Sequence, residues 1–452
     1  MYEVSLFVFS RDLRIYDNTA LVNALNESKK VIPCYFFKDE VEVLHKSNPF
    51  WSYFLIESLQ SLNKTLINQK GRLFLFTGNM MNHLLTIKKS TYFNAIFLNH
   101  EYSPYWNSIK QNLESLNVPI YISEDYLLNK PESVLTTANN PFQVFTPFFN
   151  TARVKPVRIP SPIYHQNFFT EPLPEELDFS PRKWGDLELK KHVHFHGGRE
   201  NGLKILKNLK KFKNYAVERD IPSINGTTSL SAHLNLGTCS IRETYHEMVN
   251  QLGIDHPLVR QLYWREFYVY VANHYPHVFS SNFREKYDHL EWINDEELMQ
   301  KWKDGMTGFP IIDAGIRQLN QTGFMHNRVR MIVGSFLTKD LHIDWKLGEK
   351  YFAEKLTDFD PMLNNGNWQW IAGTGCDAAP YFRVFNPWTQ QKKHDPECIY
   401  IKRWIPELQD VESQKIHNIY KKPLSDSVNY PKPILDHSKE RINALAMYKS
   451  VK

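Results

Sequence analysis

The sequence predicts an α/β domain with a parallel twisted sheet at the amino terminus, a long interdomain linker, and an all-α domain at the carboxyl terminus. Three observations lead to this fold class. Short apolar runs alternate with helix-length segments in residues 1–125, prolines become frequent in residues 126–199, and apolar residues recur at helical spacing in residues 200–452. Strands separated by helices are typical of βαβ units, which build parallel sheets.

Five short apolar runs in residues 1–125 are the expected strands. They are VSLFVF from Val4, VIPCYFF from Val31, RLFLFTG from Arg72, AIFLNH from Ala95 and VPIYIS from Val118. Neither GxGxxG nor GxxxxGKS follows the first run, so neither a Rossmann dinucleotide fingerprint nor a P-loop is predicted.

Residues 126–199 lose this periodicity and are predicted to form the linker. Their prolines are Pro131, Pro141, Pro147, Pro156, Pro160, Pro162, Pro172, Pro174 and Pro181. In residues 200–452, helical segments are expected to begin near Glu200, Ser240, His256, Asp295, Pro310, Asn327 and Leu347. Eight of the eleven tryptophans lie beyond residue 200, so this helical domain is also expected to be rich in aromatic rings.

Composition excludes several classes of protein. Cys34, Cys239, Cys376 and Cys398 lie far apart, without a CxxC pair or a histidine at ligand spacing, so neither a disulfide framework nor a zinc or iron–sulfur site is predicted. No apolar segment approaches the roughly 20 residues of a membrane span, and the first run is too short for a secretory signal, so a soluble intracellular protein is expected. The net charge is only +5, so affinity for nucleic acid would have to come from a local basic patch.

Two polar stretches of the second domain are candidates for binding a ligand. GTTSLSAHLNLGTCS from Gly226 carries hydroxyls ahead of a helical segment, which suits a phosphate group; plain helix capping is the alternative. MHNRVRM places Asn327 and Met331 on one helical face, which suits a flat aromatic ligand, and its arginines suit a carboxylate or phosphate. A solvated basic turn beside a core methionine is the alternative for MHNRVRM.

A third stretch, DFDPMLNNGNWQW, sets Asp358 and Asp360 two residues apart. Paired carboxylates bind Mg²⁺, but no further acid lies nearby, so no metal is predicted. Tryptophans gather in regions that carry these polar signals: Trp292, Trp345, Trp368 and Trp370. Their positions indicate a ring-lined pocket or an electron path, with ordinary core packing as the alternative.

Six stretches along the chain carry a family resemblance. They are RDLRIYDNTAL (11–21), FTPFFNTA (145–152), GTTSLSAHLNLG (226–237), WREFYVY (264–270), TGFPIIDAGIRQLNQTGFMHNRVRM (307–331) and NNGNWQWIAGTGCDAAPYFRVFNP (364–387). In this order and spacing the chain resembles the DNA photolyase/cryptochrome family, and most of all a class I-type cyclobutane pyrimidine dimer photolyase. The resemblance implies an α/β antenna-binding domain (1–125), the linker (126–199), and a helical domain (200–452) that binds FAD and DNA.

The resemblance also implies which residues hold a U-shaped FAD. They are Tyr215, Thr227, Thr228, Ser229, Leu230, Ser231, Asn327, Arg330, Asp358, Phe359, Asp360 and Asn364. Arg330 and Asp358 would form a buried ion pair. Asn364 would face flavin N5, where an amide stabilises the reduced anion without offering an easily transferred proton. Trp368, Trp345 and Trp292 would form the electron-transfer chain that photoreduces oxidised flavin.

On the DNA side, Trp264 and Trp370 would sandwich a lesion flipped out of the duplex, with Gln261 and Met331 beside it. Candidate contacts to DNA phosphates are Arg328, Arg383 and Arg219, followed by Lys392, Lys393, Lys402 and Arg403. For the lysines, a solvated surface is the alternative.

The implied activity is that of a deoxyribodipyrimidine photolyase, a light-driven enzyme in which reduced FAD donates one electron to a cyclobutane dimer. (6-4) photolyases usually carry histidines where this chain has Asn327 and Met331, because their chemistry needs a proton donor. The missing histidines therefore favour the cyclobutane dimer. Gln261 favours the (6-4) alternative, because cyclobutane enzymes generally have Glu there. A cryptochrome-type photoreceptor is a further alternative, disfavoured by the short segment after Leu408.

UV-damaged DNA is thus the expected partner, with no membrane, no obligatory protein partner and a monomeric state. The resemblance allows a second, antenna chromophore in the first domain, for which relatives use folate, deazaflavin or flavin. Glu101 is a candidate contact for it. The compartment would be the cytoplasm in a prokaryote, and the nucleus or another compartment in a eukaryote.

Overall fold

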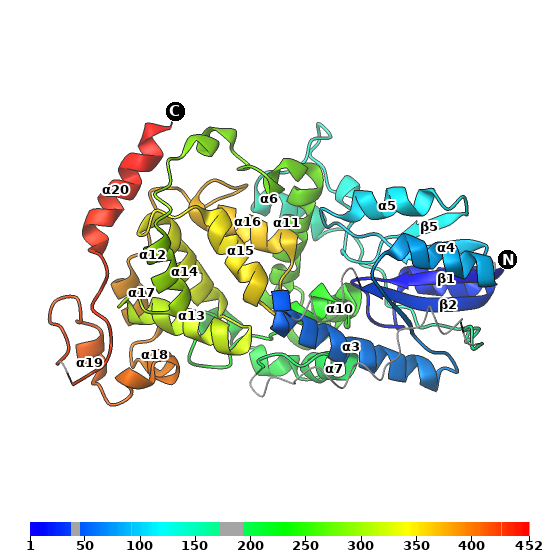
Figure 1. The fold of residues 1–452 in the computed structure, drawn as a ribbon, viewed down its shortest axis with the longest axis horizontal. Helices are drawn as coiled ribbons and strands as arrows, with labels where there is room; N and C mark the ends of the chain where they lie inside the picture. Colours follow the sequence, from blue (N-terminus) through cyan, green and yellow to red (C-terminus); the bar gives the residue numbers. More distant parts are fainter. Residues whose placement is uncertain (38–45, 92, 172, 174–192, 426, 452) are drawn as a thin grey trace.

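The computed structural model describes residues 1–37, 46–91, 93–171, 173, 193–425 and 427–451. Its amino-terminal part is a five-stranded parallel sheet with the strand order β3-β2-β1-β4-β5 (Figure 1). The strands are β1 (Tyr2–Phe9), β2 (Ser28–Phe37), β3 (Phe74–Thr77), β4 (Ala95–Asn99) and β5 (Ile120–Ser123). The α/β fold with a parallel sheet is therefore confirmed, and each predicted apolar run coincides with one strand.

The two faces of this sheet are covered by different helices. Side chains of α1 (Thr19–Glu27) and α3 (Pro49–Asn68) share one hydrophobic cluster with Phe7 of β1. Side chains of α4 (Met80–Thr91) and α5 (Trp106–Glu114) share another with Leu6. Because successive residues of a strand point to opposite faces and both faces are covered, the central strands consist of continuous apolar runs.

Residues 145–152 form a helix, α6 (Phe145–Ala152), inside the range predicted as a linker. This helix packs against α11 (Pro257–His274), where Phe145 stacks on Trp264 with ring centroids 3.6 Å apart. No other α-helix or strand occurs in residues 126–171. The linker prolines Pro172, Pro174 and Pro181 lie outside the described residues.

The carboxy-terminal part is helical, as predicted. Besides α11 its helices are α7 (Arg199–Leu206), α8 (Tyr215–Glu218), α9 (Ser231–Asn235), α10 (Ile241–Leu252), α12 (Glu296–Asp304), α13 (Pro310–Thr322), α14 (Asn327–Lys339), α15 (Trp345–Lys355), α16 (Pro361–Ala372), α17 (Pro387–His394), α18 (Ile399–Trp404), α19 (Ser413–Ile416) and α20 (His437–Ser450). No helix in the described ranges is long and apolar enough to cross a membrane.

A buried ion-pair network joins the two domains. Arg242 of α10 donates to Asp17 at 2.8 Å and to Asp125 at 2.6 Å, and Arg14 also pairs with Asp125. All four side chains are buried. Each charge has an opposite partner, so removal of one member would leave an uncompensated buried charge. The network fixes the loops at the carboxyl end of the sheet against the helical domain.

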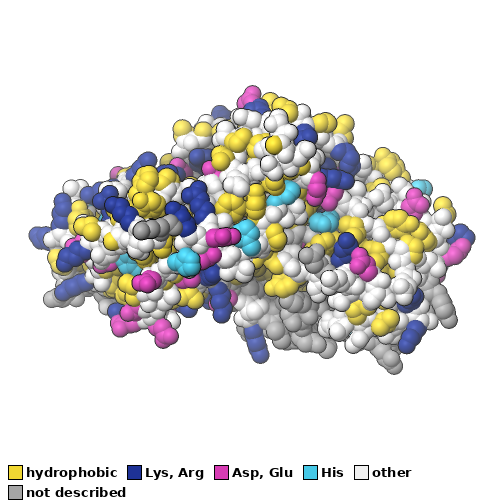
Figure 2. Space-filling view, turned by 90° about the horizontal axis from the view of Figure 1, so that it is seen from above, with side chains coloured by type: hydrophobic (Ala, Val, Ile, Leu, Met, Phe, Trp, Pro, Cys, Tyr) yellow, Lys and Arg dark blue, Asp and Glu magenta, His cyan; other side chains and the backbone are white. Residues whose placement is uncertain are grey.

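Charged side chains of both signs are spread over the surface, and Lys and Arg gather at the end of the molecule that carries α20 (Figure 2). Lys439, Arg441 and Lys449 of this helix are exposed. Tyr448 on the same helix stacks on Tyr381 with ring centroids 5.7 Å apart, which holds the loop before α17 against α20.

Candidate functional site

A large cavity of about 560 Å³ lies within the helical domain. Its walls come from α8, the segment before α9, and helices α11, α14 and α16. Cavities of this volume hold cofactor-sized ligands. All twelve residues predicted to contact FAD line this cavity, as do Gln261, Trp264, Arg328, Met331, Trp368, Trp370 and Arg219.

The hydroxyl segment forms one wall of the cavity. Helix capping was the alternative role for these hydroxyls. The residue at the N-cap of α9 is Leu230, however, and no side chain caps this helix. Within the described chain, the hydroxyls of Thr227, Thr228 and Ser231 have no hydrogen-bond partner, whereas Ser229 lies 3.2 Å from His194 Nε2. Unpaired hydroxyls facing an open cavity suit the phosphate oxygens of a dinucleotide.

The first turn of α14 contributes two arginines, each paired with an acid. Arg330 Nη2 lies 3.0 Å from Asp358 Oδ2, and Arg330 Nε donates to the Met325 carbonyl at 2.7 Å. The predicted Arg330–Asp358 ion pair is therefore present, but it is only partly buried, with 24% of the Arg330 side chain exposed. Arg328 pairs instead with Asp220, at 2.8 Å. Asn327 and Met331 lie on one helical face, as predicted, with Nδ2 3.8 Å from the thioether sulfur.

The NNGNWQW stretch lies on α16, and the two faces of this helix make different contacts. Asn364 and Trp368 line the large cavity, and Asn364 Nδ2 donates to the Glu349 carbonyl of α15 at 2.9 Å. Asn365 and Gln369 lie on another face, where both amides donate to the Val278 carbonyl at 2.9 and 3.0 Å. Half of the amides in this stretch therefore anchor a loop and do not line the cavity.

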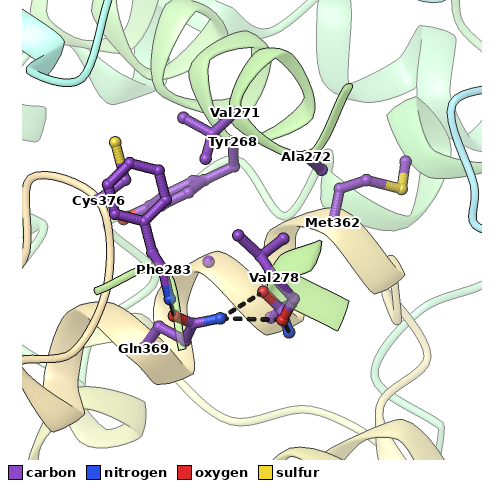
Figure 3. Close-up of a pocket in the computed structure, with 10 residues that line it drawn as sticks. Tyr268, Val271, Ala272, Val278, Phe283, Met362, Gln369 and Cys376 are labelled. Atoms are coloured by element: carbon purple, nitrogen blue, oxygen red, sulfur yellow. Dashed lines mark hydrogen bonds between the residues drawn. The ribbon is translucent and has the colours of Figure 1, made fainter. Parts of the chain in front are cut away.

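Figure 3 shows this second face, with Gln369 beside Val278 and Phe283. The hollow that they border together with Tyr268 and Cys376 measures only about 10 Å³, roughly the space of one water molecule. Tyr268 also lines the large cavity, so it borders both spaces. The small hollow is too small for a cofactor or a nucleobase.

The three tryptophans predicted to carry electrons differ in depth. Trp368 is 3% exposed and lines the cavity, Trp345 is 1% exposed, and Trp292 is only partly buried. Trp345 and Trp368 belong to one hydrophobic cluster, and Trp292 packs against it. Trp345 Nε1 donates to Asn282 at 2.9 Å, and the ring of Trp292 meets that of Tyr448 on α20. Their role in electron transfer stays a prediction.

Some predicted residues lie away from the cavity. Arg383 is exposed, with its guanidinium 5.3 Å from the ring of Phe385, and Lys392, Lys393 and Arg403 are exposed as well. Glu101, the candidate antenna contact, forms an ion pair with Arg11 at 3.0 Å. Among the described residues, no cluster of three or more His, Cys, Asp or Glu side chains could hold a metal ion.

Several cavity-lining residues were not predicted, among them Asn235, Arg265, Tyr268 and Phe324. Arg265 places its guanidinium 3.9 Å from the ring of Tyr126 and donates to the Tyr126 and Leu234 carbonyls. Arg265 and Tyr268 both lie in WREFYVY, one of the stretches that carry the family resemblance, so they could have been proposed as cavity residues from the sequence. Asn235 and Phe324 also lie in stretches that carry the family resemblance, GTTSLSAHLNLG and TGFPIIDAGIRQLNQTGFMHNRVRM, but neither was singled out there.

Buried histidines next to the cavity give the domain a pH dependence. Burial lowers the pKa of His233 and His326 to about 4, whereas an unfolded histidine titrates near about 6.5. Between these two pKa values the unfolded chain binds more protons than the folded one. The free energy of unfolding therefore falls as the pH falls through this window.

Replacing His326 by asparagine should weaken this pH dependence. His326 Nδ1 accepts from the Arg328 amide at 3.2 Å and caps α14, while its buried Nε2 has no partner. Asparagine caps helices well but does not titrate. Between about pH 7 and pH 5, the His326→Asn protein should lose about 2 kcal/mol less unfolding free energy than wild type. Urea unfolding at both pH values measures this difference. If the variant loses as much unfolding free energy as wild type between these pH values, the prediction is wrong.

Comparison with known proteins identifies the family. A family model described as the FAD binding domain of DNA photolyase matches residues 258–450, and one described as DNA photolyase matches residues 5–163. The deoxyribodipyrimidine photo-lyase of Vibrio cholerae is 37% identical over 469 residues, which cover 98% of this chain and 99% of that protein. The chain belongs to the DNA photolyase family.

Two solved structures agree with this membership. An archaeal photolyase from Sulfolobus tokodaii, described with two FAD molecules, superposes with a TM-score of 0.87 at 38% identity, covering 99% of this chain and 100% of that one. A cryptochrome from Synechocystis gives the same TM-score at 27% identity, covering 100% and 99%. The photolyase/cryptochrome fold is thus confirmed. The helical part of this DNA photolyase family member is an FAD-binding domain, and the large cavity lies within it.

Proposed function

We propose that this chain is a deoxyribodipyrimidine photolyase, a light-driven DNA repair enzyme that splits cyclobutane pyrimidine dimers. Bound reduced FAD supplies the electron that opens the cyclobutane ring on illumination. The chain's own residues bind that cofactor, hold the lesion beside it and exclude water. We further propose that the protein acts as a monomer without a protein partner.

The single observation that carries this proposal is the arrangement of the large cavity. Unpaired hydroxyls at Thr227, Thr228 and Ser231 form one wall, suited to the FAD diphosphate. Asn364 and the Arg330–Asp358 pair form another, suited to the isoalloxazine ring. FAD has both a charged and a flat aromatic part, so these two walls match it better than they match a simple phosphate or a simple apolar ligand.

The same cavity offers a place for the lesion. Trp264 and Trp370 both line it and both rings are partly exposed, so each can stack on a base. Flipping a damaged base out of the duplex costs a few kcal/mol, and stacking on an aromatic ring returns about 1–3 kcal/mol per base. Gln261 lies one helical turn before Trp264 on α11 and also lines the cavity. Its neutral amide can hydrogen-bond the carbonyl and NH groups of a pyrimidine dimer.

The test is repair of a thymine-dimer oligonucleotide by the chemically reduced protein under blue light. A dark reaction is the control, and a (6-4) oligonucleotide is assayed in parallel. Light-dependent loss of the thymine dimer alone is expected. Repair of only the (6-4) lesion would overturn the substrate assignment, and failure on both with FAD bound and reduced would favour a photoreceptor.

Arg383 is proposed to contact a DNA phosphate. The buried Lys339 Nζ donates to the Arg383 carbonyl at 3.0 Å, which fixes the backbone while the guanidinium stays exposed. Arg383→Gln should weaken binding to damaged DNA of any sequence and reduce the slope of log affinity against log salt by about one. Fluorescence anisotropy at several salt concentrations measures both quantities. The control is Lys29→Gln, at an exposed position on the sheet domain, which should leave both the affinity and the slope unchanged. An unaltered slope in Arg383→Gln would show that Arg383 does not contact a DNA phosphate.

A further inference from the structure

Arg11 belongs to the α/β domain but reaches the wall of the FAD cavity. It follows β1, and its Nη1 lies 2.9 Å from Asp360 Oδ2 and 3.0 Å from Asn235 Oδ1. Asp360 and Asn235 both line the cavity. On its other side, Arg11 Nε lies 3.0 Å from Glu101, which follows β4. One guanidinium therefore connects the carboxyl end of the sheet to the cofactor cavity.

Asp360 uses its two carboxylate oxygens in different ways. Oδ1 accepts from the backbone amides of Met362 and Leu363 at 2.9 and 3.2 Å and so caps α16. Oδ2 accepts from Arg11 and from the hydroxyl of Tyr126, the latter at 2.5 Å. The orientation of the first turn of α16 thus depends on how Asp360 is held, and α16 carries Asn364 and Trp368.

A second path leads from Arg11 to the same loop. Asn235 accepts from Arg11 through Oδ1 and donates through Nδ2 to the Phe359 carbonyl at 2.6 Å. Arg11 therefore restrains residue 360 directly and residue 359 through Asn235. The next residue back, Asp358, is the partner of Arg330.

Arg11 is also the only cation paired with Asp360 among the described residues. Burial lowers the pKa of the Arg11 guanidinium, but the nearby Asp360, Tyr126 and Glu101 raise it more, so the net pKa is raised and Arg11 stays charged. Without this charge, a buried carboxylate at the cavity wall would lose its counterion.

The two domains are joined by contacts other than the Arg11 side chain. The backbone of Arg11 packs tightly against the segment after α9: a Cβ on Gly237 would lie 2.1 Å from the Arg11 carbonyl oxygen, and Gly237 has a φ of +62°. The Leu13 amide donates to the Leu236 carbonyl at 3.0 Å, and the buried Arg242 network lies alongside. The guanidinium can therefore be removed while domain docking is retained.

We propose that Arg11 is a positioning residue for the flavin site, acting through Asp360 to fix the start of α16 and to balance the charge at the cavity wall. This inference rests on the proposed function, because it assumes that FAD occupies this cavity. It assigns the α/β domain a part in setting the affinity and reduction potential of the cofactor, in addition to any role in binding a chromophore.

The test compares Arg11→Met with Arg199→Met as a matched control. Arg199 forms a similarly buried ion pair with Glu243 at 2.7 Å but does not line the cavity. Two quantities are measured, the FAD dissociation constant by fluorescence and the FAD midpoint potential by spectroelectrochemical titration. Arg11→Met should weaken FAD binding by about tenfold or more and make the midpoint potential more negative. Arg11→Lys, which keeps the charge, should restore most of the potential.

Arg199→Met should lose thermal stability but keep the wild-type potential. If Arg11→Met binds FAD with the affinity and potential of Arg199→Met, the inference is wrong. If Arg11→Met does not fold, the FAD dissociation constant and midpoint potential of Arg11→Gln test the inference instead. This variant keeps hydrogen bonding but removes the charge. If wild type and Arg199→Met both fail to bind FAD, the proposed function itself fails, so the two failures are distinguishable.

Discussion

Replacing Trp368 by phenylalanine should abolish light-driven reduction of bound FAD while leaving repair by the chemically reduced protein intact. Trp368 is the member of the predicted chain that lines the cavity, and it is almost fully buried. Phenylalanine keeps an apolar ring in this position but is much harder to oxidise than an indole. Trp345 and Trp292 do not line the cavity, so they would lose their connection to the cofactor.

The fit of the Trp368 ring also sets a structural cost. A Cβ on Gly348 would lie 2.3 Å from the ring, and Phe352 meets it edge-on with centroids 4.9 Å apart. The smaller phenylalanine should therefore leave a gap and reduce the free energy of unfolding by about 1–3 kcal/mol. A control variant that loses similar stability at a site away from the cavity separates this loss from the loss of electron transfer.

Trp302 provides that control. It is fully buried, belongs to the same cluster and also packs on Phe352, but it does not line the cavity. Trp302→Phe should lose comparable stability and still be photoreduced like wild type. The measurement is flavin absorbance during blue illumination with an external electron donor present. Photoreduction of Trp368→Phe at the wild-type rate would exclude this electron path.

Much of the fold could be predicted because the relevant signals are local. Buried parallel strands form continuous apolar runs, and helix starts carry their own capping chemistry: Ser240, His256 and Asp295 each cap the helix expected there, and α13 begins at Pro310 as predicted. α6 was missed because Pro147 lies in a proline-rich region. Proline at that place falls in the first turn of a helix, where its missing NH is not needed.

The cavity was harder to predict, because it joins residues far apart in the chain. RDLR was a noticeable stretch, but nothing in it shows that Arg11 lies 2.9 Å from Asp360, a residue 349 positions later. Likewise, the spacing within NNGNWQW does not distinguish Asn364, which lines the cavity, from Asn365, which anchors a loop; only the family resemblance pointed to Asn364. Helical periodicity separates the two faces but does not show which of them meets the ligand.

Replacing Asn364 by aspartate should lower the midpoint potential of bound FAD and weaken binding of its reduced form. Asn364 is 8% exposed, and its Nδ2 donates to the Glu349 carbonyl at 2.9 Å. A carboxylate cannot make this bond and would place an oxygen against an oxygen. It would also add negative charge to a wall that is predicted to face a reduced, anionic flavin.

The carboxyl of Glu349 is hydrogen-bonded by the neighbouring Asn365, and burial raises its pKa to about 7. Its charge is common to wild type and Asn364→Asp, so it cancels when the two potentials are compared at one pH. Loss of the buried hydrogen bond should also cost about 1–3 kcal/mol of unfolding free energy.

The matched control is Asn365→Asp, the same chemical change at the next position of α16. Asn365 is also buried, but its amide anchors the Val278 carbonyl and it does not line the large cavity. That variant should lose stability with a smaller change in potential. Spectroelectrochemical titration of both variants over a range of pH separates the two effects. Equal potentials in Asn364→Asp and wild type would show that Asn364 does not face the flavin, whatever the loss of stability, because a charge placed beside the cofactor shifts its potential.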